Sequence, residues 1–122
     1  MSSVFIRSFK HALRGMRICF ATERSFRLQV AIGLAVISLS LALPLVAWQR
    51  VIVWFVVMVV LVLELVNSSV ERMVDLVKPR LSECAGDIKD IMAGAVLVAS
   101  FFAVLIGLMI FLPFFVFVLR TV

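Results

Sequence analysis

The chain has 122 residues, of which 65% are hydrophobic, and it carries a formal net charge of +5 with a mean hydropathy of +1.25. Soluble domains have about 45–50% apolar residues, so this composition excludes a soluble enzyme and predicts a single all-α membrane domain over residues 1–122. No basic patch interleaved with aromatic residues lies outside the apolar segments, and we therefore expect no nucleic acid among the partners.

An amphipathic helix is predicted at the N-terminus, over about residues 4–21. Its apolar positions recur at steps of three and four, the spacing of one helix face, and they are Phe5, Phe9, Leu13, Met16 and Phe20. Basic residues keep the same spacing on the opposite side, at Arg7, Lys10, Arg14 and Arg17. Such a helix lies on a membrane surface. It is either an anchor whose cations reach the lipid head groups, or a surface on which some cations also meet an anionic substrate.

Three apolar segments follow, at about residues 28–48, 51–70 and 91–119. Each has the roughly 20 residues that a helix needs to cross the hydrocarbon core. Only Gln49 and Arg50 separate the first two segments, which predicts a short hairpin at these residues. The third segment is longer than a bilayer requires, which favours tilt, and Pro113 is expected to end or kink its last turns.

The distribution of basic residues sets the expected orientation. They are concentrated before the first span and between the second and third, at Arg7, Lys10, Arg14, Arg17, Arg24, Arg27, Arg72, Lys78, Arg80 and Lys89. Arg50 and Arg120 lie at the opposite ends of the spans. Because basic residues accumulate on the cytoplasmic side, we expect the N-terminus and residues 71–90 to be cytoplasmic and the C-terminus to lie outside.

A polar stripe runs through the second apolar segment, in "LVLELVNSSVERMVDLV". Its members are Glu64, Asn67, Ser68, Glu71 and Asp75. In an α-helix each residue advances by about 100°, so all of them fall within about 60° of Glu64. A carboxylate deep in a membrane helix marks a functional site by default, whereas Glu71 and Asp75 lie nearer the interface and could simply be solvated.

Two further polar clusters are expected at the same membrane level. "ATERSFRLQ" places Glu23 and Arg27 four residues apart, where they could form no more than a helix salt bridge. "AGDIKDIMAGA" opens the third span with Asp87, Lys89 and Asp90, and acidic residues there also suit the helix dipole. The stripe and the clusters together give the candidate site, which consists of Glu23, Glu64, Asn67, Glu71, Lys89 and Asp90.

Carboxylates, an amide and a lysine in one place suit phosphoryl transfer. Glutamate oxygens can hold Mg²⁺ that is shared with substrate phosphates, a lysine neutralises phosphate charge, and another carboxylate can accept a proton from an attacking hydroxyl. The chain has no G-x-x-x-x-G-K-[ST] or G-x-G-x-x-G motif, so ATP would be handled outside the familiar kinase folds. Two alternatives stay open: a proton or cation pathway that uses Glu64 and Glu71 as a relay, and a noncatalytic membrane subunit whose stripe only packs helices together.

The segments "ELVNSSVERMVDL" and "AGDIKDIMAGAVLVAS", with "ERSFRLQ" upstream, resemble the small bacterial integral-membrane diacylglycerol kinases and their relatives that phosphorylate undecaprenol. The resemblance covers nearly the whole chain. It implies a homotrimer in the bacterial cytoplasmic membrane, with a surface helix and three spans per subunit and active sites shared between subunits. It also implies ATP as phosphate donor, Mg²⁺ as cofactor, and diacylglycerol or undecaprenol as substrate.

The resemblance assigns roles to the candidate residues. It implies that Glu64 is the catalytic base on the lipid hydroxyl and that Asn67 helps to place it. The glutamates at Glu23 and Glu71 would bind the metal of the nucleotide. Lys89 and Asp90 would contact the nucleotide itself.

Overall fold

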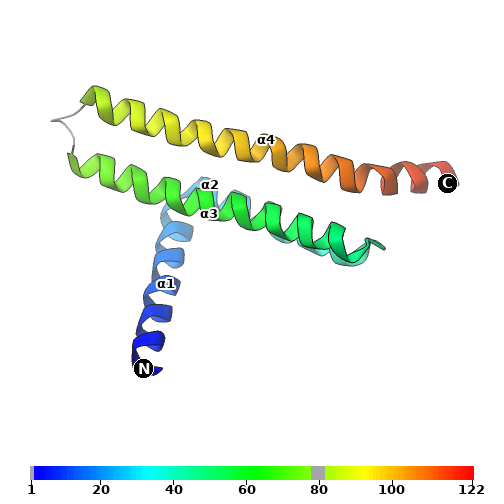
Figure 1. Cartoon of the computed structure of the whole chain (residues 1–122), viewed down its shortest axis with the longest axis horizontal. Coiled ribbons are helices and arrows are strands. Elements are labelled where there is room, and N and C mark those ends of the chain that lie inside the picture. The colour runs from blue at the N-terminus through cyan, green and yellow to red at the C-terminus, as the bar shows by residue number, and fades with distance from the viewer. Residues whose placement is uncertain (1, 78–81) are drawn as a thin grey trace.

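The computed structural model describes residues 2–77 and 82–122, and the regular elements in these ranges are all helices. They are α1 (Ser2–Thr22), α2 (Arg24–Ala42), α3 (Ala47–Val77) and α4 (Ser82–Thr121). Figure 1 shows α3 and α4 running side by side, with α2 largely behind α3, while α1 leaves these helices at a steep angle. Helices α2, α3 and α4 are long and apolar enough to cross a membrane. The predicted all-α membrane fold, with an N-terminal amphipathic helix and three spans, is confirmed.

Glu23 forms the corner between α1 and α2. Its backbone is extended, with φ −111° and ψ 108°, so it interrupts the helix for a single residue. Arg27 stabilises this corner because its Nη1 atom donates to the carbonyls of Phe20, at 2.8 Å, and Ala21, at 3.1 Å. These carbonyls lie in the last turn of α1, where no intrahelical partner is available. Arg27 therefore caps α1 and does not form the salt bridge with Glu23 that was considered from the sequence.

The hairpin between α2 and α3 lies at residues 43–46 and not at Gln49 and Arg50, so the predicted boundary is wrong. The reason is Pro44, which lacks an N–H and pushes the residue before it into an extended conformation. Leu43 accordingly has φ −89° and ψ 152°. Gln49 and Arg50 belong to the first turns of α3, where the Gln49 side chain accepts a hydrogen bond from the Val46 N–H at 3.1 Å.

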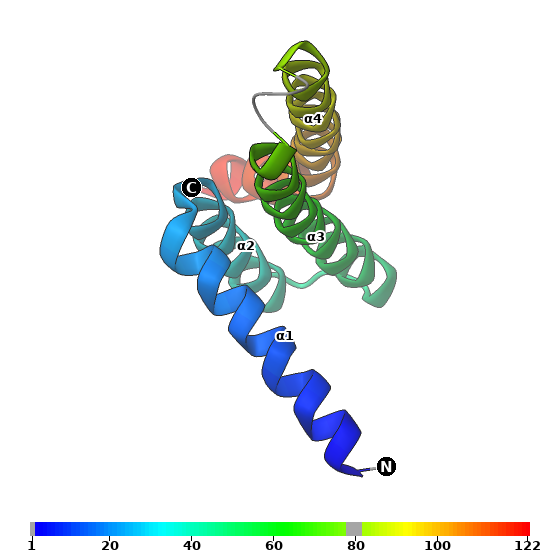
Figure 2. The same cartoon turned by 90° about the vertical axis from the view of Figure 1, so that its left-hand side faces the viewer.

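α3 is the central helix, because it packs against both α2 and α4 (Figure 2). Gly33 lets α2 and α3 approach closely: a Cβ atom at this position would lie 2.9 Å from Cγ1 of Val57. Near the hairpin the spans share a small apolar core, made of Leu45, Val53, Ile110 and Phe111. Most other large apolar side chains of the spans are exposed, as expected for helices that face lipid or further copies of the chain.

α4 is longer than the predicted third span at both ends. It begins at Ser82 and continues through Pro113 to Thr121, so the proline does not end the helix. Figures 1 and 2 show the last turns of α4, in red, turned away from the line of the turns before them, in agreement with the predicted kink. Lys78 and Arg80, which were counted among the cytoplasmic charges, lie outside the described residues.

Candidate active site

The polar stripe occupies the half of α3 that is remote from the hairpin. Its side chains become more exposed towards the C-terminal end of α3. Glu64 and Ser68 are buried, with 5% and 6% exposure. Asn67 and Glu71 are half-buried, whereas Asp75 is exposed. The stripe divides into two sides, one that meets the start of α2 and one that faces α4.

Two hydrogen bonds join α3 to the start of α2. The Ser25 hydroxyl donates to Oε1 of Glu64 at 3.1 Å, and the Ser68 hydroxyl donates to Oε1 of Glu23 at 3.3 Å. Glu23 occupies the N-cap position of α2, but its side chain makes no capping bond to that helix. The carboxylate is therefore turned towards α3, although an acidic residue at this position commonly caps its own helix.

The last turn of α1 contacts α3 next to this side of the stripe. Arg72 donates from Nη2 to Oγ1 of Thr22 at 2.8 Å and so ties α3 to the last turn of α1. Cys19 is buried there, with 4% exposure. Burial raises the pKa of the Cys19 thiol, and its interaction with the Ser68 hydroxyl opposes that rise only in part. A buried thiol of raised pKa is chemically inert, so Cys19 serves to pack α1 against α3.

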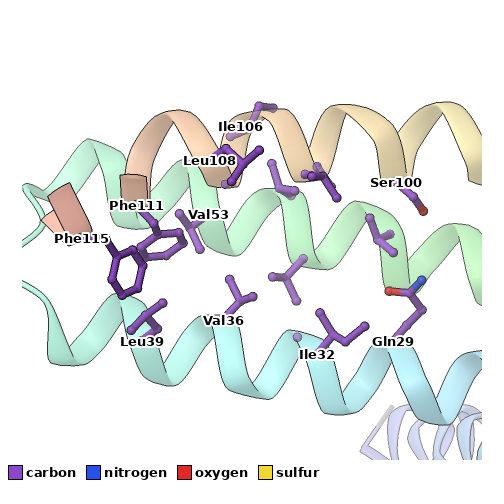
Figure 3. Close-up of a pocket in the computed structure, with 17 residues that line it drawn as sticks. Gln29, Ile32, Val36, Leu39, Val53, Ser100, Ile106, Leu108, Phe111 and Phe115 are labelled. Carbon is purple, nitrogen blue, oxygen red and sulfur yellow. The ribbon is translucent and has the colours of Figure 1, made fainter. Parts of the chain in front are cut away.

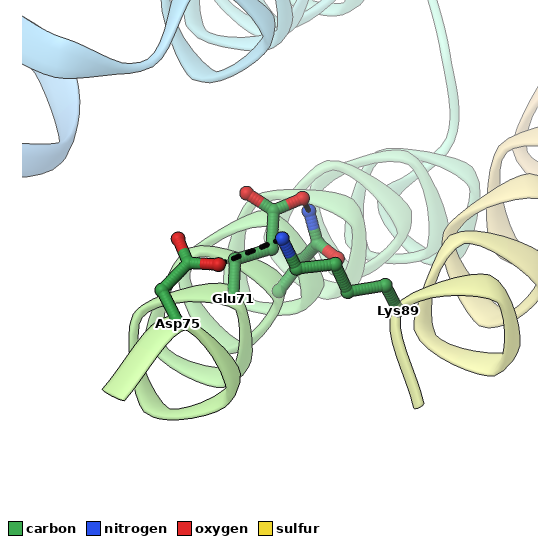
Figure 4. A network of polar contacts seen from close by, with 4 residues as sticks. Glu71, Asp75 and Lys89 are labelled. Atoms are coloured by element: carbon green, nitrogen blue, oxygen red, sulfur yellow. Dashed lines mark hydrogen bonds and ion pairs between the residues drawn. The ribbon is translucent and has the colours of Figure 1, made fainter. Parts of the chain in front are cut away.

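The other side of the stripe meets α4. Asn67 donates from Nδ2 to Oε1 of Glu71 at 3.4 Å, one turn further along α3. Lys89 reaches from α4 to the acidic face of α3, where its Nζ atom lies 2.8 Å from Oδ1 of Asp75 (Figure 4). Lys89 thus lies at the same level as Glu71 and Asp75, which is the arrangement expected from the sequence.

Asp90 is not drawn into this cluster. It is exposed, and the described part of the chain offers it no hydrogen bond or ion pair. Its neighbour Lys89 faces α3, and successive residues of a helix point about 100° apart. Within one chain, therefore, Glu23 and Glu64 lie on the side of the stripe that meets α2, and Asp90 stays at the margin. The other three predicted site residues lie on the side that faces α4, and they are Asn67, Glu71 and Lys89.

Two glutamates of the site could serve as ligands for a metal ion. Among the described residues no three His, Cys, Asp or Glu side chains gather closely enough to hold a metal ion. Mg²⁺ in phosphate-transferring sites is usually bound through one or two carboxylates together with substrate phosphates. Glu23 and Glu71 are hard oxygen donors of this kind, each anchored by a side-chain hydrogen bond. The described residues therefore offer carboxylate ligands but no complete metal cage of their own.

Sequence reasoning missed two members of this site. Ser25 was given no role, and Ser68 was noted only as part of the stripe. The signal for Ser68 was its position one turn after Glu64. For Ser25 the one available signal was its position two residues after Glu23. The periodicity of α3 does not show which residues of α2 face α3.

An apolar pocket of about 390 Å³ lies between α2, α3 and α4. Gln29 is at one end of it and Phe111 and Phe115 are at the other (Figure 3). Gln29 is one helical turn beyond Ser25, so the polar end of the pocket is the end nearest Glu64. The pocket volume is within the roughly 300–1,000 Å³ typical of small-molecule sites.

Comparisons with known proteins show which family the chain resembles. A family model described as prokaryotic diacylglycerol kinase matches residues 10–111. The chain is 39% identical over 107 residues to a diacylglycerol kinase of Synechocystis, covering 87% of this chain and 61% of that protein. It is 36% identical over 109 residues to an undecaprenol kinase of Bacillus subtilis, covering 89% of both. It is also 34% identical over 101 residues to a diacylglycerol kinase of Escherichia coli, covering 82% of both. The chain thus spans less than two thirds of the Synechocystis protein but most of the other two.

Proposed function

The chain belongs to the prokaryotic diacylglycerol kinase family, and on this basis we propose that it is a membrane lipid kinase that transfers the γ-phosphate of ATP to the hydroxyl of a membrane lipid. The observation that supports this most directly is the polar stripe of α3 together with the lysine that faces it. A buried carboxylate, Glu64, lies on the same stripe as the half-buried Glu71, and Lys89 approaches from α4.

Glu64 is the general base in this proposal. The lipid hydroxyl loses its proton to the Glu64 carboxylate while its oxygen bonds to the γ-phosphorus, and the bond from that phosphorus to the oxygen of the β-phosphate breaks to release ADP. Burial of Glu64 keeps water away from the reacting hydroxyl. Asn67, one turn from Glu64, orients the reacting groups through its amide.

The nucleotide binds at the interfacial end of the stripe. Lys89 contacts the phosphates as a point charge, and Asp90 contacts the nucleotide from the exposed side of α4. Glu23 and Glu71 hold the Mg²⁺ that accompanies ATP, which supplies charge neutralisation for the phosphates. Their serine and asparagine partners keep the two carboxylates in place.

The lipid tail extends from Glu64 towards the hairpin. The apolar pocket between α2, α3 and α4 begins near Gln29 and continues along the spans, so a hydrocarbon chain placed in it brings its hydroxyl end towards the stripe. Diacylglycerol and undecaprenol both present a hydroxyl at the same depth, and both remain candidate substrates.

The chain works as a homotrimer in the bacterial cytoplasmic membrane, with active sites shared between subunits. The N-terminus and the α3–α4 connection are cytoplasmic and the C-terminus is outside, as the basic residues indicate. A reporter fused after Val122 that behaved as cytoplasmic would overturn this orientation.

A phosphorylation assay tests the proposed function. The purified protein is mixed in detergent with radiolabelled ATP, Mg²⁺ and either diacylglycerol or undecaprenol, and label is followed into the lipid. We expect transfer to at least one lipid, and transfer to neither would overturn the proposal. The relay alternative gains nothing from the structure, because Arg50, at the outer end of α3, donates to the backbone carbonyls of Ser40 in α2 and Leu43 in the hairpin and not to a carboxylate.

A further inference from the structure

We propose that Ser25 is a positioning residue for the catalytic base: its hydroxyl orients the Glu64 carboxylate towards the lipid hydroxyl. This inference rests on the proposed function of Glu64 and adds a residue to which nothing in the sequence assigned a role. It is carried by the 3.1 Å hydrogen bond from Ser25 Oγ to Glu64 Oε1 and by the burial of Glu64.

Because the Glu64 side chain is buried, its carboxylate needs a hydrogen-bond donor within the protein. A buried carboxylate that lacks hydrogen bonds is strongly unfavourable. In the part of the chain that the structure describes, no buried side-chain nitrogen or oxygen atom lacks a partner, and Ser25 is the side chain that supplies the bond to Glu64. The bond engages one carboxylate oxygen, Oε1, and in the proposal Oε2 is the atom that accepts the proton of the lipid.

The Ser25 hydroxyl behaves differently from the other serines of α2. Ser38 donates to the Leu34 carbonyl at 2.8 Å and Ser40 donates to the Ile37 carbonyl at 2.6 Å, both within their own helix. Such back-bonding is usual for serine inside a helix. Ser25, in the first turn of α2, instead directs its hydroxyl across to α3.

The bond also fixes Glu64 relative to Glu23. Ser25 and Glu23 lie two residues apart, and Ser68 and Glu64 lie four residues apart, so the two bonds cross between the same two segments in opposite directions. This reciprocal pairing sets the base and the proposed metal ligand at a constant separation. In enzymes that act mainly by positioning their reactants, accurate placement of the catalytic groups accounts for a large part of the rate enhancement.

The test is a set of variants assayed with saturating lipid and ATP. Ser25→Ala should lower kcat about tenfold, the order expected when a hydrogen bond to a charged group is lost. The KM for ATP should change by less than about twofold, because Ser25 is not placed at the nucleotide. Ser25→Thr keeps the hydroxyl and should restore most of the rate. Ser38→Ala removes an equivalent hydroxyl from the same helix and should leave kcat unchanged.

A double-mutant cycle with Glu64→Gln separates positioning from a general structural effect. If Ser25 acts through Glu64, adding Ser25→Ala to Glu64→Gln should cost no further activity. An equal loss in both backgrounds, or a parent-like rate for Ser25→Ala while Glu64→Gln is strongly impaired, would overturn the inference and leave the proposed function intact. A parent-like rate for Glu64→Gln would instead overturn the role of the base itself. Helicity and thermal stability in detergent, measured for each variant, identify any that fail to fold.

Discussion

Glu23 and Ser68 are 45 residues apart in the sequence, yet their side chains meet at 3.3 Å between the corner of α1 and α2 and the middle of the α3 stripe. Glu23 is the residue at which the surface helix turns into the membrane, so its extended backbone both ends α1 and points its carboxylate at α3. The break in the helix is thus part of the site. A helix that continued unbroken through Glu23 would give this side chain a different direction.

The first prediction concerns Glu64→Gln. This change keeps the shape of the side chain and an oxygen that can accept the Ser25 hydrogen bond, but it removes the proton acceptor. Loss of a general base lowers rates by about 10²- to 10⁴-fold. Initial rates of lipid phosphorylation at saturating substrates measure the effect, and a rate within a few-fold of the parent would show that Glu64 is only a structural polar residue.

Variants of Lys89 and Asp75 distinguish two roles of Lys89: its ion pair with Asp75 and its proposed contact with phosphate. The pair is solvent-accessible, with side chains 31% and 60% exposed, and exposed pairs contribute only about 0–1 kcal/mol. Asp75→Asn should therefore change stability and kcat little, whereas Lys89→Met should raise the KM for ATP by about tenfold or more. Equal losses in the two variants would mean that the ion pair itself is what matters.

The two cysteines should differ in reactivity. Burial raises the pKa of Cys19, and only the thiolate reacts with alkylating reagents, so at pH 7 to 8 little of Cys19 is reactive. Cys84 is exposed. Mass spectrometry after brief iodoacetamide treatment in mild detergent should find Cys84 modified first. Rapid modification of Cys19 would mean that α1 does not stay packed against α3.

The hairpin offers a test of stability remote from the site. Ser40 is fully buried and accepts a hydrogen bond from Nε1 of Trp54 at 2.9 Å. Ser40→Ala leaves the indole N–H without this partner and should lower the free energy of unfolding by about 1–3 kcal/mol. Adding Trp54→Phe removes the unpaired donor and should recover part of that loss. Denaturant titrations in detergent, with kcat as a control that should not change, compare the three proteins.

The sequence predicted some features of this molecule well and others poorly, for physical reasons. The spans and the stripe depend on the composition and periodicity of single helices, which a sequence shows directly. The hairpin was misplaced because Arg50 was taken as a residue of the turn. Its long side chain instead folds back from α3 to donate to the carbonyls of Ser40, at 3.0 Å, and Leu43, at 3.2 Å. Ser25 was missed because the register between two helices is set by close contacts such as that of Gly33 with Val57.

The last prediction separates the metal ligands from the base. Glu23 and Glu71 come from different elements and are each held by a neutral partner, Ser68 and Asn67. If both hold the Mg²⁺ of the nucleotide, Glu23→Gln and Glu71→Gln should each raise the Mg²⁺ concentration needed for half-maximal rate. Protein ligands mainly place an ion that is already bound to ATP, so excess Mg²⁺ should restore part of the activity of both variants.

Glu64→Gln is the matched control for that titration, because it lies on the same stripe and removes the same charge. Extra Mg²⁺ cannot replace a proton acceptor, so this variant should show the Mg²⁺ dependence of the parent at a uniformly lower rate. The readout is the initial rate of lipid phosphorylation against Mg²⁺ at fixed ATP. If all three variants share one Mg²⁺ dependence, the division of roles between Glu64 and the other two glutamates is wrong, even where each variant has lost activity.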